Sequence, residues 1–305
     1  MKWIKQQLIY VAHGRYPWAQ THAMIPTPDI INAKIIRVYL TFCDANGIGR
    51  VGFVELKTDN LNTIHKISQK PVLDIGKPGT FDENGVLQCS IVTLDDGRKY
   101  LYYAGFELGT KIRYRLLTGL AVSEDGGNSF KRIQKTPVLE RSDQELYFRG
   151  GPFVMLDNGL FKMWYVAGSK WMEIDGINKP VYTIKYLESS DGIQWGNHGV
   201  VCIDIENEME HGFGRPYVVK ENGLYRMFYS IRVKHKGYRL GYAESENGIS
   251  WIRKDNEAGI DVSQTGWDSG MVCYSSVVKV NGKTYMFYNG NEFGKTGFGY
   301  SVLNG

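Results

Sequence analysis

The most conspicuous acidic groups of this sequence occur in three related turns, where a carboxylate could donate or accept a proton. The turns are SEDGGNSF at 123–130, SSDGIQW at 189–195 and SENGISW at 245–251. Each combines a Ser, an Asp or Asn, a Gly and a terminal aromatic residue. Such short polar side chains hydrogen-bond the local backbone, while Gly adopts positive φ. The pattern therefore indicates a structural role, which makes Asp125 and Asp191 poor catalytic candidates.

These turns belong to a pattern that recurs along the chain. A strand rich in aromatic residues appears five times, and the tyrosines that mark it are Tyr39, Tyr103, Tyr165, Tyr229 and Tyr288. Their spacings are 64, 62, 64 and 59 residues. Another strand and a tight turn, often Asn-Gly, precede the marked strand, a third strand follows it, and we expect a fourth. The pattern predicts an all-β fold, a five-bladed β-propeller with four antiparallel strands per blade, as a single domain over residues 1–305.

Charge and composition argue against several classes of partner. The formal net charge is +4 without any block of like charge, so we expect neither nucleic acid nor a membrane as partner. Polar residues at 5–7 interrupt the region where a signal peptide would be apolar, and we expect a cytoplasmic protein. The four cysteines show no CxxC or metal-ligand spacing and are interpreted as buried free thiols. The sequence thus predicts no metal and no cofactor.

The repeat and its S-x-[DN]-G-x-x-W turns resemble those of the five-bladed propeller glycosidase superfamily. This superfamily includes proteins of the arabinanase and xylosidase kind, the invertase kind and the mannoside-phosphorylase kind. The resemblance covers nearly all five repeats. It implies a carbohydrate or sugar-phosphate ligand, with functional groups at the channel-facing start of each blade's first strand and catalytic carboxylates from different blades.

Carried onto this sequence, that rule selects five segments at equivalent phase in the repeat, namely 21–28, 79–85, 145–152, 210–216 and 266–275. Their polar side chains should approach one axis. The catalytic candidates are the carboxylates Asp82, Glu83, Glu210 and Asp268. The substrate-binding candidates are His22, Arg149, His211, Arg215, Tyr274 and, from a long loop insertion, Trp171.

Glycoside cleavage needs an acid that protonates the leaving oxygen and a second group that attacks or activates the attacker. In a phosphorylase the attacker is phosphate, and Arg149 and Arg215 would suit such a bidentate oxyanion, an acidic sugar or a sugar nucleotide. Each Arg could instead pair with a neighbouring Glu, such as Glu145. His22 and His211 could transfer protons or orient a hydroxyl, although a structural role is commoner for a lone His.

The chain departs from the superfamily at one pattern that bears on chemistry. The glycosidase relatives usually present an Asp-Pro pair in the first blade, whereas the pair here is Thr27-Pro28. Asp29 follows and should point to the opposite face of the strand. The third and fourth blades have Gly151-Pro152 and Arg215-Pro216. The standard carboxylates are thus missing at these positions, which argues against ordinary hydrolysis.

Three functions of different classes remain open at this point. The first is a carbohydrate-active enzyme, hydrolase or phosphorylase-like, acting on a glycoside or an anionic or phosphorylated sugar in the central channel. The missing Asp-Pro carboxylates favour the second, a non-catalytic propeller that binds a carbohydrate or sugar nucleotide. The third is a protein-interaction scaffold, since the architecture often serves as one. Polar residues at five equivalent positions speak against the scaffold.

Overall fold

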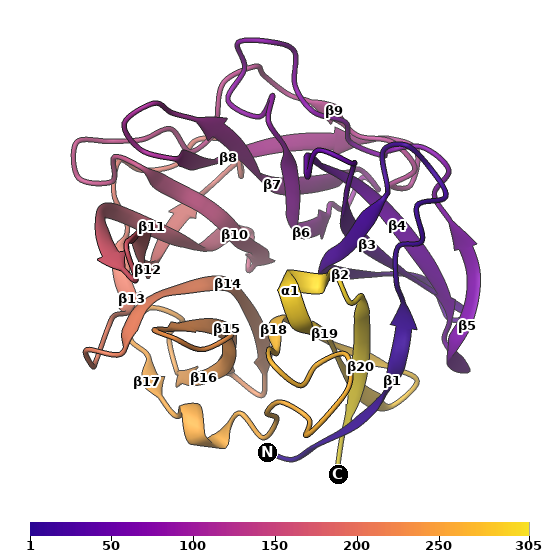
Figure 1. Cartoon of the computed structure of the whole chain (residues 1–305). Coiled ribbons are helices and arrows are strands. Elements are labelled where there is room, and N and C mark those ends of the chain that lie inside the picture. The colour runs from indigo at the N-terminus through magenta and orange to yellow at the C-terminus, as the bar shows by residue number, and fades with distance from the viewer. Residues whose placement is uncertain (305) are drawn as a thin grey trace.

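The computed structural model describes residues 1–304, and its regular structure is almost entirely β-strand. The sheets surround a central axis in the manner of a propeller (Figure 1). The first set of strands is β2 (Thr21–Asn32), β3 (Ile35–Cys43), β4 (Gly49–Lys57) and β5 (Asn60–Ile67). The second set is β6 (Val86–Thr93), β7 (Lys99–Leu108), β8 (Tyr114–Ser123) and β9 (Lys131–Arg132).

Three further sets follow in chain order. The third is β10 (Phe148–Asp157), β11 (Leu160–Ile174), β12 (Ile177–Ser189) and β13 (Val200–Ile203). The fourth is β14 (Glu210–Glu221), β15 (Leu224–Val233), β16 (Arg239–Ser245) and β17 (Ile252–Arg253). The last is β18 (Cys273–Val280), β19 (Lys283–Asn289), β20 (Phe298–Leu303) and β1 (Trp3–Tyr10). Two short helices complete the described elements, a 3-10 helix at Asp255–Glu257 and α1 at Asn291–Gly294.

Pairing within each set is antiparallel, which confirms the predicted all-β propeller architecture. The second and third sets are joined by a short parallel pairing of β8 with β10, so that they form one eight-stranded sheet beside three four-stranded sheets. Because this pairing merges two sets, the blade count of five stays a prediction. No helix within residues 1–304 is long and apolar enough to cross a membrane.

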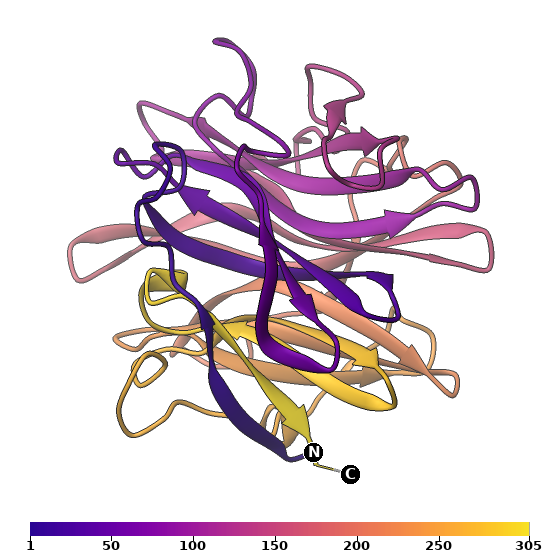
Figure 2. The ribbon, with the colours of Figure 1, turned by 90° about the vertical axis from the view of Figure 1, so that its right-hand side faces the viewer.

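The two ends of the chain close the ring of sheets. Strand β1 pairs with β20, with Trp3 opposite Leu303, and both termini lie together at one edge of the molecule (Figures 1 and 2). A buried side chain reinforces this closure: Asn289 Oδ1 accepts a hydrogen bond from the backbone N–H of Ile25 at 2.7 Å. The N-terminal strand thus completes the set of strands formed by the C-terminal end of the chain.

The predicted hairpins form because the sequence supplies turn residues between strands that bury apolar side chains. Asn158, Asn222 and Asn281 have φ of 53°, 52° and 50°, and each precedes a Gly that also has positive φ. Positive φ at both central residues is what a two-residue type I′ turn requires. The second strand is covered on both faces, and in β3 residues 36–43 are all buried.

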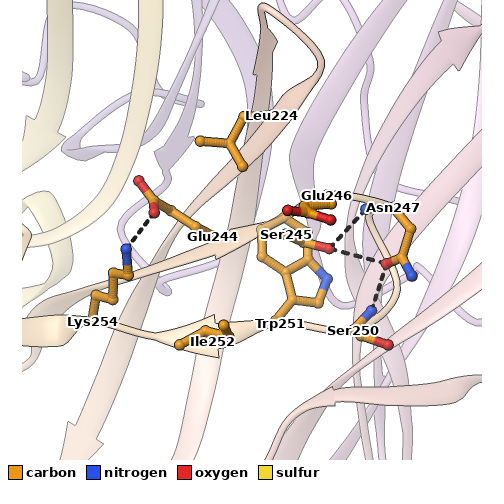
Figure 3. A pocket seen from close by; sticks show the side chains of 9 residues that line it. All are labelled: Leu224, Glu244, Ser245, Glu246, Asn247, Ser250, Trp251, Ile252 and Lys254. Atoms are coloured by element: carbon orange, nitrogen blue, oxygen red, sulfur yellow. Dashed lines mark hydrogen bonds and ion pairs between the residues drawn. The ribbon is translucent and has the colours of Figure 1, made fainter.

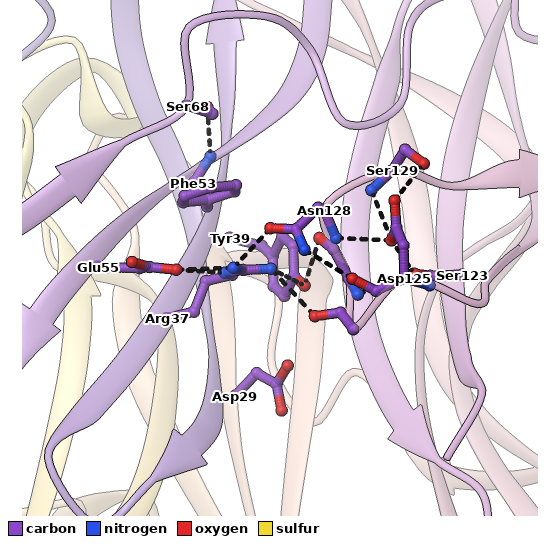
Figure 4. Close-up of polar contacts among 12 residues, drawn as sticks. Asp29, Arg37, Tyr39, Phe53, Glu55, Ser68, Ser123, Asp125, Asn128 and Ser129 are labelled. Atoms are coloured by element: carbon purple, nitrogen blue, oxygen red, sulfur yellow. Dashed lines mark hydrogen bonds and ion pairs between the residues drawn. The ribbon is translucent and has the colours of Figure 1, made fainter. Parts of the chain in front are cut away.

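The polar turns after the third strands dock neighbouring sets of strands, as Figure 4 shows for the first of them. Ser123 Oγ accepts the backbone N–H of Gly127 at 2.8 Å, and the Gly127 carbonyl accepts Tyr39 Oη–H from β3 at 2.9 Å. Two equivalent inter-set bonds run from Tyr102 Oη to the Gly192 carbonyl and from Trp164 Nε1 to the Gly248 carbonyl, each at 2.8 Å. The predicted structural role of these turns is confirmed.

The acid of the first turn is engaged by its own loop. Partial burial opposes ionisation, but hydrogen bonds from Ser129 and Ser123 lower the pKa of Asp125 to about 2. Beside it Arg37 pairs with Glu55 at 2.7 Å and donates to Asn128 Oδ1 at 2.9 Å (Figure 4). This network fastens the second strand of one set to the turn of the next.

Candidate functional site

The innermost strand of every set contains a β-bulge at a similar point. One extra residue enters between Met24 and Thr27 in β2, Gln88 and Ser90 in β6, Gly150 and Phe153 in β10, Gly214 and Tyr217 in β14, and Cys273 and Ser276 in β18. Bulges re-aim side chains and are frequent beside active sites. Each copy of the sequence repeat thus contributes one such bulge, and the bulges lie around the central axis.

The bulges show which residue-proline pair of β2 is equivalent to the residue-proline pairs of β10 and β14. In β10 and β14 the bulge contains Gly151–Pro152 and Arg215–Pro216, and in β2 it contains Ile25–Pro26. Thr27–Pro28, the pair that the sequence pattern selected, lies beyond the bulge. The reason is the inserted residue, because a single extra residue shifts the phase of all those after it. An acidic residue is absent from the corrected position as well.

Several bulge residues have strained backbones. Ile25, Arg215 and Tyr274 have φ of 57°, 44° and 54°, and His22, at a second bulge of β2, has φ of 59°. Such conformations cost about 1–3 kcal/mol each for residues other than Gly and cluster at functional sites. Two of these four residues, His22 and Tyr274, line a cavity at the ends of the inner strands.

A cavity of about 350 Å³ opens among the ends of these inner strands. Its polar side chains include His22 and Asn84. Its aromatic side chains are Phe106, Tyr114, Tyr238, Tyr274 and Phe293. Figures 1 and 2 place α1, which carries Phe293, near the axis on one face of the molecule. The structure therefore brings His22 and Tyr274, both predicted to bind substrate, into one cavity.

The aromatic side chains of this cavity contact one another. The Phe293 ring lies 5.1 Å from that of Tyr238 in an edge-to-face arrangement and stacks on Tyr274 at 6.3 Å. Phe106 and Tyr114 are 5.4 Å apart. Flat apolar faces of this kind can stack against the C–H faces of a sugar ring or against a planar group. Among the described residues that line the cavity, none is an Asp or Glu.

Two of the predicted catalytic carboxylates lie in a repeated structural network. Asp82 is fully buried, accepts Tyr103 Oη–H at 2.9 Å and pairs with Arg132 at 2.6 Å. The equivalent contacts of Asp268 are with Tyr288 Oη at 3.0 Å and Lys5 Nζ at 2.6 Å. In each case a tyrosine of the second strand and a cation hold an acid that precedes the inner strand. The two acids therefore connect strands, and a catalytic role for them stays a prediction.

The other two predicted carboxylates differ in their surroundings. Glu210 is buried against Arg253 at 2.6 Å, and although burial opposes ionisation, hydrogen bonds from Arg253 lower the pKa of Glu210. Glu83 is partly exposed, accepts the Gly79 N–H at 2.6 Å and directly precedes Asn84, which lines the cavity. Of the four predicted catalytic acids, Glu83 is therefore the one whose neighbour in the sequence lines the cavity.

The two arginines predicted to bind an oxyanion are both buried, in different surroundings. Arg149 pairs with Glu145 at 2.6 Å, which is the alternative that the sequence left open. Arg215 lies at the axis and reaches three other inner strands, donating to Thr27 Oγ1 at 2.9 Å, the Cys89 carbonyl at 3.4 Å and the Ser275 carbonyl. Within residues 1–304 it pairs with no carboxylate, and burial lowers the pKa of Arg215 to about 10.

His211 is buried, and its Nδ1 has no hydrogen-bond partner in the described chain. Burial and the nearby Arg232 lower the pKa of His211 from 6.5 to about 4. The unfolded chain therefore binds a proton at a pH where the folded protein does not. The stability that the neutral ring contributes is complete above pH 6.5 and is lost as the pH falls towards 4.

We accordingly expect the urea midpoint to fall between pH 6.5 and 4, and His211→Gln to remove part of that slope. Urea unfolding at a series of pH values measures the effect. His65→Gln, at an exposed site, is the matched control and should leave the slope unchanged. Identical slopes in wild type and His211→Gln would contradict the assignment.

Trp171 occupies a strand, not the loop insertion that the sequence suggested. The segment forms an extended β11–β12 hairpin in which Trp171 pairs with Pro180. The Trp171 ring packs 5.7 Å from Tyr114, behind the cavity wall. Residues 170–174 and 177–181 keep pairing after a bulge between Ala167 and Lys170, so the predicted loop insertion is a pair of strands.

Of the five aromatic residues that line the cavity, only Tyr274 was predicted from the sequence, because the other four lie outside the starts of the first strands. Phe106 lies at the end of a second strand, and Tyr238 and Phe293 lie in the connections after second strands. These connections return to the same end of the sheets as the starts of the inner strands. Aromatic residues at or just after the ends of the second strands were the sequence signal that could have identified this lining.

A second cavity of about 350 Å³ lies on the outer part of the β14–β17 sheet (Figure 3). Its acid Glu244 pairs with Lys254 at 2.5 Å, and Asn247 Oδ1 accepts the Ser250 N–H at 2.8 Å. Trp251 belongs to the docking turn. Because these polar groups satisfy one another, we interpret this cavity as part of the turn architecture.

Comparison with known proteins finds a relative over the full length. The chain is 34% identical over 303 residues to the uncharacterized protein Rv1502 of Mycobacterium tuberculosis (strain ATCC 25618 / H37Rv), and the match covers 99% of each chain. No protein-family model matches the chain.

Solved structures with low sequence identity share the architecture. One is a thermostable family-43 glycoside hydrolase, with a TM-score of 0.69, 22% identity, and coverage of 94% of this chain and 90% of that one. Another is the β-1,2-mannobiose phosphorylase from Listeria innocua in complex with β-1,2-mannobiose, with a TM-score of 0.72, 10% identity, and coverage of 99% and 96%. These likenesses confirm the resemblance to propeller glycosidases and phosphorylases at the level of fold.

Proposed function

We propose that this chain, which belongs to the same family as the uncharacterized protein Rv1502 of Mycobacterium tuberculosis, is a carbohydrate-active enzyme. The glycoside binds in the axial cavity, and the reaction is hydrolysis or transfer, with phosphorolysis included. We further propose that residues 1–305 form a single domain with five blades, one for each bulged inner strand. The fold shared with a glycoside hydrolase and a mannobiose phosphorylase supports this assignment.

One observation carries the proposal: the aromatic cavity coincides with the ring of bulges at the axis. Five aromatic rings offer apolar faces, while His22 and Asn84 offer hydrogen-bonding groups that can fix the orientation of hydroxyls. Largely apolar cavities with a few placed polar groups are the usual form of small-molecule sites. A sugar combines both surfaces, and this makes it the ligand class that fits the lining.

Glu83 is our proposed proton donor to the leaving oxygen. It is partly exposed and precedes Asn84 of the cavity wall, whereas Asp82, Glu210 and Asp268 are buried in ion pairs. Burial opposes ionisation of Glu210, but hydrogen bonds from Arg253 lower its pKa, while Asp82 and Asp268 are engaged by Arg132 and Lys5. Glu83 faces no such cation in its two hydrogen bonds, which involve Gly79 and Asn84.

Turnover in a screen of glycosides and glycosyl phosphates, with and without inorganic phosphate, tests the assignment. We expect Glu83→Gln to lower turnover about 100-fold or more with ligand affinity retained, since general acid catalysis contributes about 10²–10⁴. Glu246→Gln, at an exposed site near the outer cavity, is the control and should keep full activity. Unchanged turnover in Glu83→Gln would remove Glu83 from the mechanism.

The second candidate function is a propeller that binds a carbohydrate or sugar nucleotide without transforming it. The absence of Asp and Glu from the lining, within the part of the chain that the structure describes, favours it. Calorimetry combined with product analysis separates the two functions. Binding without any product after long incubation supports the binding protein, and detection of product supports the enzyme.

A further inference from the structure

A buried cation lies directly behind the aromatic wall of the axial cavity. Arg232, near the end of β15, is only 6% exposed. Its Nη1 donates to the Pro180 carbonyl at 2.9 Å, while its Nε has no hydrogen-bond partner in the described structure. Among the ion pairs of residues 1–304, none includes Arg232. Burying a charge without a counter-ion is costly, so this guanidinium calls for an explanation.

Tyrosines separate this guanidinium from the cavity. The guanidinium carbon lies 4.6 Å from the centre of the Tyr182 ring and 5.9 Å from that of Tyr238. Tyr182 and Tyr114 share a hydrogen bond between their hydroxyls at 3.2 Å. Tyr114, Tyr238 and Tyr274 also line the cavity. A charge at such a range acts strongly because the rings exclude water from the intervening space.

Two other cations lie close to His211, which is itself a neighbour of Arg232. Besides burial and Arg232, Lys179 and Lys234 contribute to lowering the pKa of His211. Neither lysine takes part in an ion pair among the described residues. Lys295 lies near the cavity residue His22 and is balanced by its pair with Glu292 at 2.9 Å. The charged groups named here that lack an ion pair among the described residues, Arg232, Lys179 and Lys234, are therefore all positive.

We propose that the sugar bound in the axial cavity carries an oxyanion, a carboxylate or phosphate ester, that binds at the tyrosine wall in front of Arg232. Resting on the carbohydrate-active function proposed above, this inference adds the chemical class of the substrate. The hydroxyls of Tyr238 and Tyr274 can donate to the oxyanion, Tyr114 shares its hydroxyl hydrogen bond with Tyr182, and Arg232 supplies the positive charge behind them. Arg232 is thus a positioning residue that acts through the tyrosines, and a neutral sugar would leave its charge uncompensated.

Isothermal titration calorimetry with the full chain tests this class. The probes are glucose, galactose and mannose, the corresponding uronates and 1-phosphates, and inorganic phosphate alone. For at least one sugar we expect the uronate or the 1-phosphate to bind roughly tenfold to hundredfold more tightly than the neutral form, with a preference that weakens as salt is added. In Arg232→Met, which is neutral and of similar length, this preference should disappear while binding of the neutral sugar persists.

Two further variants keep the test decisive. Arg232→Lys retains the charge and should retain most of the preference, and Tyr238→Phe, which removes one donor, should weaken it if Arg232→Met does not fold. Equal affinity for neutral and charged sugars, or a preference that persists in Arg232→Met, would overturn the inference. So would inorganic phosphate that binds as tightly as the sugar phosphates without competing with any sugar. Failure of every sugar to bind would instead count against the carbohydrate function itself.

Discussion

Arg215→Met is expected to lower the free energy of unfolding by about 3–5 kcal/mol, because several buried acceptors would lose their donor at once. The guanidinium donates to Thr27 Oγ1 at 2.9 Å, to the Pro26 carbonyl at 3.2 Å and to the Ser275 carbonyl. Each unsatisfied buried acceptor costs about 1–3 kcal/mol. Removing a buried charge offsets part of this loss, because burial lowers the pKa of Arg215 to about 10 while the group still carries its charge at pH 7.

Urea unfolding at pH 7 measures this effect. The control is Arg98→Met, since Arg98 is 45% exposed and pairs with Asp96 on the surface at 2.8 Å, a type of contact that contributes roughly 0–1 kcal/mol. If Arg215→Met were no less stable than Arg98→Met, the inner strands would not depend on the axial guanidinium. Arg215→Lys should fall between the two, because one ammonium cannot reach acceptors on three strands.

Glu145→Gln is expected to have a similarly large effect for an electrostatic reason. Glu145 is 1% exposed, pairs with Arg149 at 2.6 Å and Lys185 at 2.8 Å, and accepts Tyr165 Oη–H at 2.8 Å. The amide would leave two cations, one of them fully enclosed, without a counter-charge. Breaking a buried pair in this way costs about 3–5 kcal/mol. We expect a corresponding loss in the free energy of unfolding, measured by denaturant titration.

Asp96→Asn on the surface is the matched control and should change stability by less than about 0.5 kcal/mol. Asp82→Asn, in the equivalent position of another set of strands, should lose stability in the same direction as Glu145→Gln. An Asp82→Asn protein of native stability without activity would instead restore Asp82 as a catalytic group. Native stability of Glu145→Gln would refute the strand-connecting role of this network.

The architecture could be predicted from the sequence because its determinants are local and repeated. Alternation of apolar and polar residues, Asn-Gly pairs such as Asn222-Gly223, and the Ser-x-Asp-Gly turns each encode a strand or a turn within a few residues. Because the same strand and turn pattern recurs along the chain, each copy supports the assignment of the others. The structural interpretation of Asp125, made from its neighbours in the chain, was correct for the same reason.

The site was only partly predictable, because equivalent phase in a repeat does not determine where a side chain points. His22 and Tyr274 do reach the cavity, whereas Arg149 and Asp82 start at the same phase and are buried against Glu145 and Arg132. For Asp82 the deciding partner, Arg132, comes from a distant part of the chain, and the sequence contains no short-range signal for that pairing. For Arg149 the partner is Glu145, four residues earlier, which is the alternative that the sequence had left open.

The sequence by itself determined the propeller architecture and the end of the sheets at which functional groups gather. Only the tertiary structure decided which residues form the cavity and which charges remain unpaired. One extra residue in each inner strand shifted the phase to Ile25–Pro26, and the connections after second strands delivered Tyr238 and Phe293. The physical reason is range: strands and turns follow from neighbouring residues, whereas the burial and partners of Arg215 and Arg232 depend on strands far away in the chain.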